Sequence, residues 1–151
     1  MINHAKGFTL IELMVSVAIL FIMALVALPS WTKLIQDNSL TAAVNQVESV
    51  YQLARSEALK RHETVTLTST NSLHTWTIND ASSAALKTIS LPSENVSITK
   101  IGSASEISIA IKSSGFSENT KIGFSWESEY RCLTIYSSGQ SKITTSSGDC
   151  S

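Results

Sequence analysis

The first apolar stretch of the chain is long and almost unbroken. Residues 8–28 carry a single charged side chain, Glu12. As a helix with a rise of 1.5 Å per residue, these residues span about 31 Å, enough to cross the hydrocarbon core of a bilayer. Pro29 follows the run and cannot donate a hydrogen bond to the carbonyl of Leu25. We therefore expect a membrane-spanning helix that bends or stops at Pro29.

The second stretch has the period of an amphipathic helix. Its apolar residues are spaced four and three apart, at Leu40, Val44, Val47, Tyr51, Ala54 and Ala58. This spacing places them on one helical face, with polar residues largely opposite. Glu57 and Arg61 stand four apart in the order that favours an ion pair. The pattern predicts a helix to about Lys60 that packs on a sheet, in preference to a coiled coil.

The third stretch, residues 64–151, alternates with the period of strands. Val65 and Leu67 alternate with threonines, Asn71 and Ser72 suit a turn, and residues 73–78 alternate again, which predicts a hairpin. Further strands are expected near residues 86–91, 96–101, 107–111, 122–126, 132–136 and 142–143, with a loop at 81–85. About seven short, mostly antiparallel strands predict an α+β fold: a long N-terminal helix packed on an antiparallel sheet.

Composition and charge exclude several functions. The balance of 11 basic and 12 acidic residues gives a net charge of −1, which exerts no global attraction on nucleic acid. The histidines are scattered, and the sequence has no metal-ligand spacing, phosphate loop or glycine-flanked nucleophilic serine. We expect no catalytic residues, no metal and no cofactor. Trp31, Trp76 and Trp126 are interpreted as core or interface anchors.

The two cysteines, Cys132 and Cys150, leave two interpretations open. Outside the cytoplasm we expect them to form a disulfide, and otherwise they are two unrelated buried thiols. A disulfide closing this loop stabilises the fold by roughly 3 kcal/mol in the chain-entropy account.

The residues before the apolar run suggest processing on its N-terminal side. A secretory signal has its small-residue cleavage site after the apolar core, but here Gly7 precedes it. A cut after Gly7 removes residues 1–7 with Lys6, leaving 10 basic against 12 acidic residues, or −2. Lys6 favours a cytoplasmic position for this end, with the rest of the chain across the membrane. Glu12 is costly in an apolar helix unless it is paired or reaches the headgroups.

Across the expected cut the chain reads Gly7-Phe8-Thr9-Leu10-Ile11-Glu12-Leu13. This segment, followed by the apolar run, closely resembles the processing site of type IV prepilins and type II secretion pseudopilins. The resemblance implies cleavage between Gly7 and Phe8 by a prepilin peptidase, and N-methylation of Phe8. It also implies that Glu12 guides docking into a filament by pairing with the amino terminus of an adjacent subunit. Pro29 would then be a flexible point inside one long helix.

Two further segments narrow the resemblance. They are residues 54–67, where the helix runs into the first strand, and the C-terminal pattern from Ile107 through Gly115-Phe116 and Leu133-Thr134-Ile135 to Ser138-Gly139. Both are similar to minor pilins and pseudopilins of the FimT/FimU and GspH (type II secretion protein H) family. The implied organisation is a leader at 1–7, an assembly helix at 8–29 and a periplasmic or extracellular head at 30–151, helical to about residue 62.

The function implied is a non-catalytic minor subunit for assembly or the tip of a type IV pilus, and the alternatives are a GspH-type pseudopilin or a DNA-binding pilin. Implied partners are other pilins or pseudopilins, prepilin peptidase and inner-membrane lipid. The implied location is the inner membrane, then an extracellular pilus or a periplasmic pseudopilus.

Some FimT-like pilins bind DNA through a Gly-Arg-x-Arg segment. Here the matching residues 139–142 keep one charge, Lys142, as the candidate nucleic-acid contact. The cations at residues 55–62 are interleaved with glutamates and suit a solvated helix end.

Overall fold

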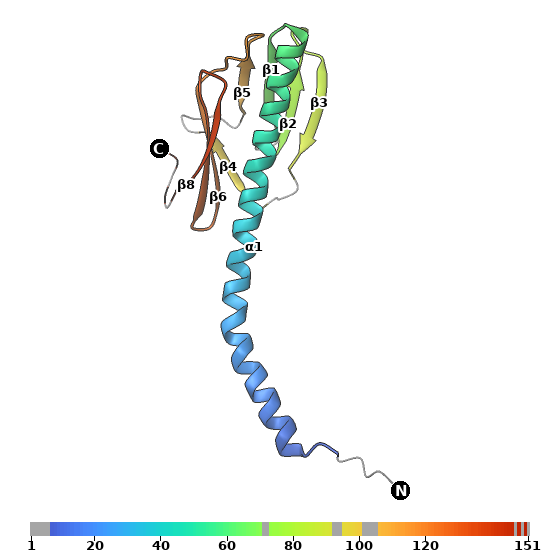
Figure 1. The fold of residues 1–151 in the computed structure, drawn as a ribbon, viewed down its shortest axis with the longest axis vertical. Helices are drawn as coiled ribbons and strands as arrows, with labels where there is room; N and C mark the ends of the chain where they lie inside the picture. Colours follow the sequence, from blue (N-terminus) through green and yellow to red (C-terminus); the bar gives the residue numbers. More distant parts are fainter. Residues whose placement is uncertain are drawn as a thin grey trace. The chain divides into compact units, whose positions relative to one another are not determined.

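The computed structural model describes residues 7–70, 73–91, 95–100, 106–146, 148 and 150, without the side chains of residues 26–30 and 100. Within these ranges the chain forms one helix, α1 (Leu10–Arg61), followed by eight strands (Figure 1). It divides into two compact units, Met1–Ile35 and Gln36–Ser151.

The first unit is the N-terminal part of α1. The helix starts after Thr9, whose side-chain oxygen accepts a hydrogen bond of 3.3 Å from the backbone amide of Glu12. Such a cap satisfies one of the amide groups that a helix leaves unpaired at its start. The helical backbone continues through Pro29. A helix end at Pro29 was one of two expected outcomes, and the backbone instead remains helical on both sides.

In the second unit, α1 contributes one face to the hydrophobic core. Each member of the predicted stripe is at most 1% exposed: Leu40, Val44, Val47, Tyr51, Ala54 and Ala58. The periodicity is confirmed, and the helix ends at Arg61, within one residue of the expected position. Arg61 and Glu57 form the ion pair expected from their spacing, with 2.9 Å between Nε and Oε2.

The strands form two antiparallel sheets of four. Sheet A has the order β3-β2-β1-β5, from β1 (Val65–Thr70), β2 (Thr75–Asn79), β3 (Ala85–Ser90) and β5 (Ser108–Ile111). Sheet B has the order β4-β6-β7-β8, from β4 (Ser97–Lys100), β6 (Thr120–Trp126), β7 (Glu129–Ile135) and β8 (Ser141–Ser146). The α+β class is therefore confirmed, and the strands are divided between two sheets. The turn at Asn71–Ser72 and the segment after Lys100 lie outside the described residues.

The core lies where α1 meets the inner faces of both sheets. Trp76 and Ile78 of sheet A and Phe124 and Leu133 of sheet B are at most 1% exposed. The alternate residues on β1 and β2 point outwards and are mainly threonines. Trp126 packs against the margin of the core, whereas Trp31, in the first unit, is 66% exposed.

Candidate functional site

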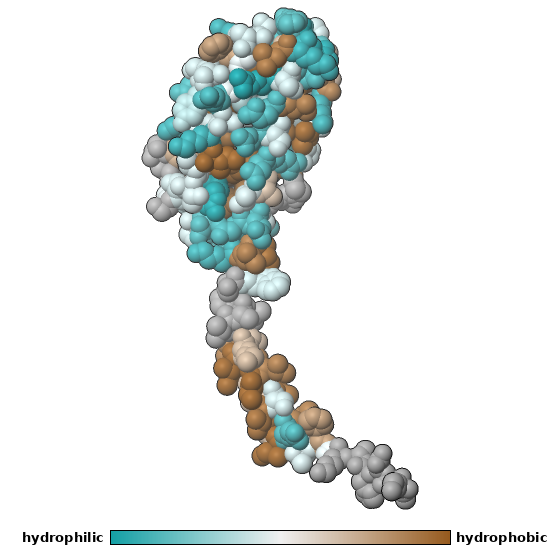
Figure 2. Space-filling model, in the orientation of Figure 1, coloured by the Kyte–Doolittle hydropathy of each residue, from teal (hydrophilic) through white to brown (hydrophobic). Residues whose placement is uncertain are grey.

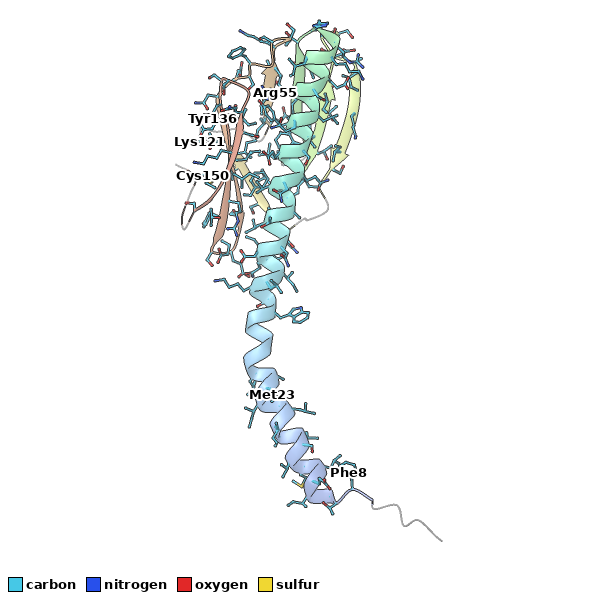
Figure 3. The ribbon with its side chains drawn as sticks, in the orientation of Figure 1. Phe8, Met23, Arg55, Lys121, Tyr136 and Cys150 are labelled. Carbon is cyan, nitrogen blue, oxygen red and sulfur yellow. A yellow bond between two sulfur atoms is a disulfide. The ribbon has the colours of Figure 1, made fainter. Side chains whose placement is uncertain are left out.

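The first unit presents an apolar surface that nothing within it covers. Every large apolar side chain described from Phe8 to Leu25 is between 50% and 82% exposed (Figures 2 and 3). A helix that is apolar on all sides is stable only in an apolar environment or against other helices. Within the described residues, which omit side chains 26–30 of the expected span, we find no helix with the length and hydropathy needed to cross a membrane.

Gly7, Phe8 and Glu12 lie together at the start of this surface. Gly7 has open space around its Cα and Phe8 is 82% exposed, so both flank an accessible peptide bond. Glu12 stands in the first turn of α1, three residues after the capping Thr9, where the helix dipole favours a negative charge. The local geometry thus gives Glu12 a favourable helical position. Its pairing with a neighbouring subunit stays a prediction.

In the second unit, α1 is fastened to two turns, at residues 112–116 and 136–140. The hydroxyl of Tyr51 donates to the carbonyl of Gly139 at 3.0 Å and lies 3.0 Å from the hydroxyl of Ser117. One turn along α1, Arg55 donates from Nε to the carbonyl of Gly115 at 3.1 Å. Gly115 and Gly139 have φ angles of 81° and 80°, which glycine adopts without strain. This network joins the helix to both sheets.

A disulfide joins Cys132 on β7 to Cys150, and their Cα atoms are 5.6 Å apart. This is the pairing expected from the sequence. Gly123 on β6 lies directly opposite Cys132, and a Cβ at Gly123 would stand 3.2 Å from the sulfur of Cys150. The glycine leaves room for the bridge on the outer face of sheet B, a requirement that no local sequence signal revealed.

The same outer face carries Lys142, the candidate nucleic-acid contact. Lys142 on β8 and Lys121 on β6 both lie opposite Thr134 of the central strand β7, so the three side chains form one row across the sheet. Both lysines are exposed, and Figure 3 shows Lys121 on the side of sheet B away from α1. Lys121 was not expected from the sequence, because only the strand register brings it beside Lys142.

Two of the cations at the end of α1 bind groups within the head. Arg55 binds Gly115, while Arg61 binds Glu57 and lies 3.9 Å from Glu63. The hydrogen bond from Arg61 lowers the pKa of the Glu57 carboxyl below its ordinary value. In the described part of the chain, no cluster of three or more His, Cys, Asp or Glu residues is placed to hold a metal ion.

Comparison with known families agrees with this architecture. The family described as Type II transport protein GspH matches residues 43–139, which include most of the core, the turn at 112–116 and residues 136–139 of the other turn. The chain belongs to this family. A second model, the prokaryotic N-terminal methylation motif, matches residues 2–28 of this GspH-family chain. The resemblance seen in the sequence is therefore confirmed for both ends of the chain.

Individual relatives agree on the fold. Two fimbrial proteins of Pseudomonas aeruginosa are 42% identical over 60 residues, so the match spans 40% of this chain and about two fifths of their own length. The crystal structure of the type IV minor pilin FimU of P. aeruginosa matches 75% of this chain and 93% of its own, with a TM-score of 0.63 and 16% identity. The minor pseudopilin EpsH from the type 2 secretion system of Vibrio cholerae matches 69% and 97%, with a TM-score of 0.52 and 15% identity.

Proposed function

We propose that this GspH-family chain is a non-catalytic minor subunit of a type IV pilus, acting in its assembly or at its tip. The N-terminal part of α1 would anchor the chain in the inner membrane and later pack against sister helices. The observation that carries the proposal is the uncovered apolar surface from Phe8 to Leu25, together with the methylation motif matched at residues 2–28. Lipid, and then neighbouring helices, would cover this surface and keep it from water.

Processing would follow the motif. Prepilin peptidase would cut between Gly7 and Phe8, dividing the leader 1–7 from the assembly helix 8–29 and the head 30–151, and Phe8 would be N-methylated. The mass of the mature N-terminal peptide from native cells tests this step. A peptide beginning with methylated Phe8 is expected, whereas a chain that still begins with Met1 would instead indicate an unprocessed membrane protein.

Glu12 is proposed to set the register of the helix in the filament by pairing with the amino terminus of an adjacent subunit. The pairing matters most in an apolar surround, where an unpaired carboxylate is costly. Glu12→Val should leave cleavage intact but remove the chain from sheared filaments, and Glu12→Asp should be less severe. Normal amounts of Glu12→Val in the sheared fraction would contradict a role in register.

The second candidate is a pseudopilin of a type II secretion system. The GspH family match and the EpsH-like fold support it, while the FimU-like fold supports the pilus. Deletion of the gene separates the two. Loss of surface pili with normal protein secretion is expected for the minor pilin, and the reverse phenotype would favour the pseudopilin.

A DNA-binding role is the third candidate, and the row of Lys121 and Lys142 is its structural support. Two lysines neutralise few phosphates, so such binding would be weak and sensitive to salt. A gel-shift assay with the oxidised head tests it. Binding at low salt that is lost in the Lys121→Gln, Lys142→Gln double variant would support this role.

A further inference from the structure

A pocket of about 270 Å³ lies between the last turns of α1 and the open edge of sheet A. Three apolar and three charged side chains line it: Leu53, Glu57 and Arg61 from α1, Ile78 from β2, and Leu86 and Lys87 from β3. Figure 2 shows hydrophobic surface in this region, between α1 and β3, with hydrophilic residues around it. The pocket therefore has an apolar floor and a charged rim.

The pocket depends on an irregularity in the strand pairing. Lys87 lies opposite Ile78, but Ala85 lies opposite Asn79, so Leu86 is an extra residue between them. In a regular strand, neighbouring side chains point to opposite faces. A bulge changes this alternation and redirects a side chain. Here both Leu86 and Lys87 line the pocket, which a regular strand would not allow.

The rim carries one cation, Lys87, that is not paired there. Arg61 is paired with Glu57 at 2.9 Å and also lies 3.9 Å from Glu63, so its charge is neutralised. Lys87 is exposed, and among the residues that the structure describes we find no carboxylate within ion-pair distance of it. The charge left unpaired beside the apolar floor is therefore that of Lys87. The matching ligand is an apolar group with an adjacent acid.

The size and position of the pocket select the kind of occupant. Its volume is below the range of about 300–1,000 Å³ typical of small-molecule sites and suits a single large side chain. Addition of a whole strand to the β3 edge is disfavoured, because a bulge and an inward-facing lysine are the devices that block edge pairing. A side chain that fills a pocket and is flanked by an ion pair is a common anchor at protein interfaces.

We infer that this pocket, defined by its six lining residues, receives one large apolar side chain and a neighbouring carboxylate from an adjacent pilin subunit. The inference rests on the proposed function, and it names the surface through which the head contacts its neighbour. The apolar side chain contacts Leu53, Ile78 and Leu86, while the carboxylate pairs with Lys87.

Photocrosslinking of the full-length chain in its own cells tests the contact. Benzoylphenylalanine replaces Ser56, an exposed residue of α1 beside the pocket. In a control variant it replaces Thr144, an exposed residue of β8 on the other sheet. Mass spectrometry then identifies the adducts in the sheared filament fraction. From Ser56 we expect an adduct with another pilin, at a peptide with an apolar residue next to Asp or Glu.

Charge variants in the Ser56 background make the test specific. Lys87→Glu should lower the adduct yield by about two- to fivefold, the scale of losing an ion pair at a surface. Lys87→Arg should keep the yield. The matched control, Lys121→Glu, makes the same charge change at an exposed site of sheet B and should have no effect. Leu86→Ala, which removes part of the floor, should also lower the yield.

The outcomes separate this inference from the proposed function. If the chain is absent from filaments, the proposed function fails. If the chain is in filaments but the Ser56 adduct is absent, joins only a non-pilin protein, or responds equally to Lys87→Glu and Lys121→Glu, the pocket inference is overturned.

Discussion

Replacing Gly139 by alanine tests how α1 is fastened to the two sheets. Gly139 has a φ of 80°, a backbone conformation that residues with a side chain rarely adopt. A Cβ at this position would overlap the carbonyl oxygen of Gly115 and stand 2.8 Å from Nε of Arg55. The carbonyl belongs to the backbone of the neighbouring turn and cannot rotate away. The two turns must therefore separate to accept the methyl group.

The expected cost follows from these contacts. The left-handed backbone costs an alanine about 1–2 kcal/mol more than a glycine. Separating the turns weakens two buried or half-buried hydrogen bonds, from Tyr51 to Gly139 and from Arg55 to Gly115. Each contributes about 1 kcal/mol, or more where a buried group loses its partner. The sum is about 3–5 kcal/mol, a large part of the roughly 5–15 kcal/mol that stabilises a domain.

Urea unfolding of residues 36–151 in the oxidised form measures this difference. This unit contains every core residue from Leu40 onwards, and the buried Trp76 provides a fluorescence signal. The matched control is Gly148→Ala, because a Cβ at Gly148 meets nothing within 4 Å. The control should change the free energy of unfolding by less than about 0.5 kcal/mol.

A Gly139→Ala variant as stable as the Gly148→Ala control would refute the account of the fastened turns. Should Gly139→Ala not fold at all, Tyr51→Phe gives a graded measurement. It removes only the hydroxyl that bonds Gly139 and Ser117 and should cost about 1–3 kcal/mol. No measurable loss in Tyr51→Phe would refute the same account independently.

Two further predictions concern the disulfide and two carboxyl groups. Replacing Cys132 and Cys150 by serine opens the loop between residues 18 apart and should lower the free energy of unfolding by roughly 3 kcal/mol, measured by urea unfolding of the oxidised and double-serine proteins. An unchanged midpoint would show that the loop is already constrained without the bridge. The pKa values of Glu57 and Asp80 are lowered from 4.5 and 3.8, chiefly by hydrogen bonds from Arg61 and Ser82. The folded state binds protons at these two carboxyl groups less tightly than the unfolded state does, so the ionised carboxylates stabilise the fold. This contribution to stability is present above the ordinary pKa values and is lost as the pH falls through the lower folded values. Carbon-13 NMR titration of the carboxyl groups checks this, and midpoints at or above 4.5 and 3.8 would contradict it.

The sequence was most informative where structure depends on neighbours along the chain. The stripe from Leu40 to Ala58 follows the helical period, so its burial was predictable residue by residue. The hairpin of β1 and β2 was predictable because a short connection joins two alternating runs. The disulfide was predictable because the chain has only two cysteines.

Long-range pairing was less accessible. β1 pairs with β5, about forty residues further on, and this choice separates sheet A from sheet B. Alternation indicates which face of a strand is buried but not which strand lies beside it. The row of Lys121 and Lys142, the space above Gly123 and the bulge at Leu86 all depend on such pairing. Each is therefore visible only in three dimensions.

The bridge at Cys150 also determines the face of the head from which a segment placed behind it would leave. The sulfur of Cys150 lies above Gly123 on the outer face of sheet B. A fluorescent protein or affinity tag fused behind it would leave from that face, whereas the α1–β3 pocket belongs to sheet A. A fusion behind Cys150 therefore keeps a reporter for imaging or pull-down work away from the pocket and its neighbour.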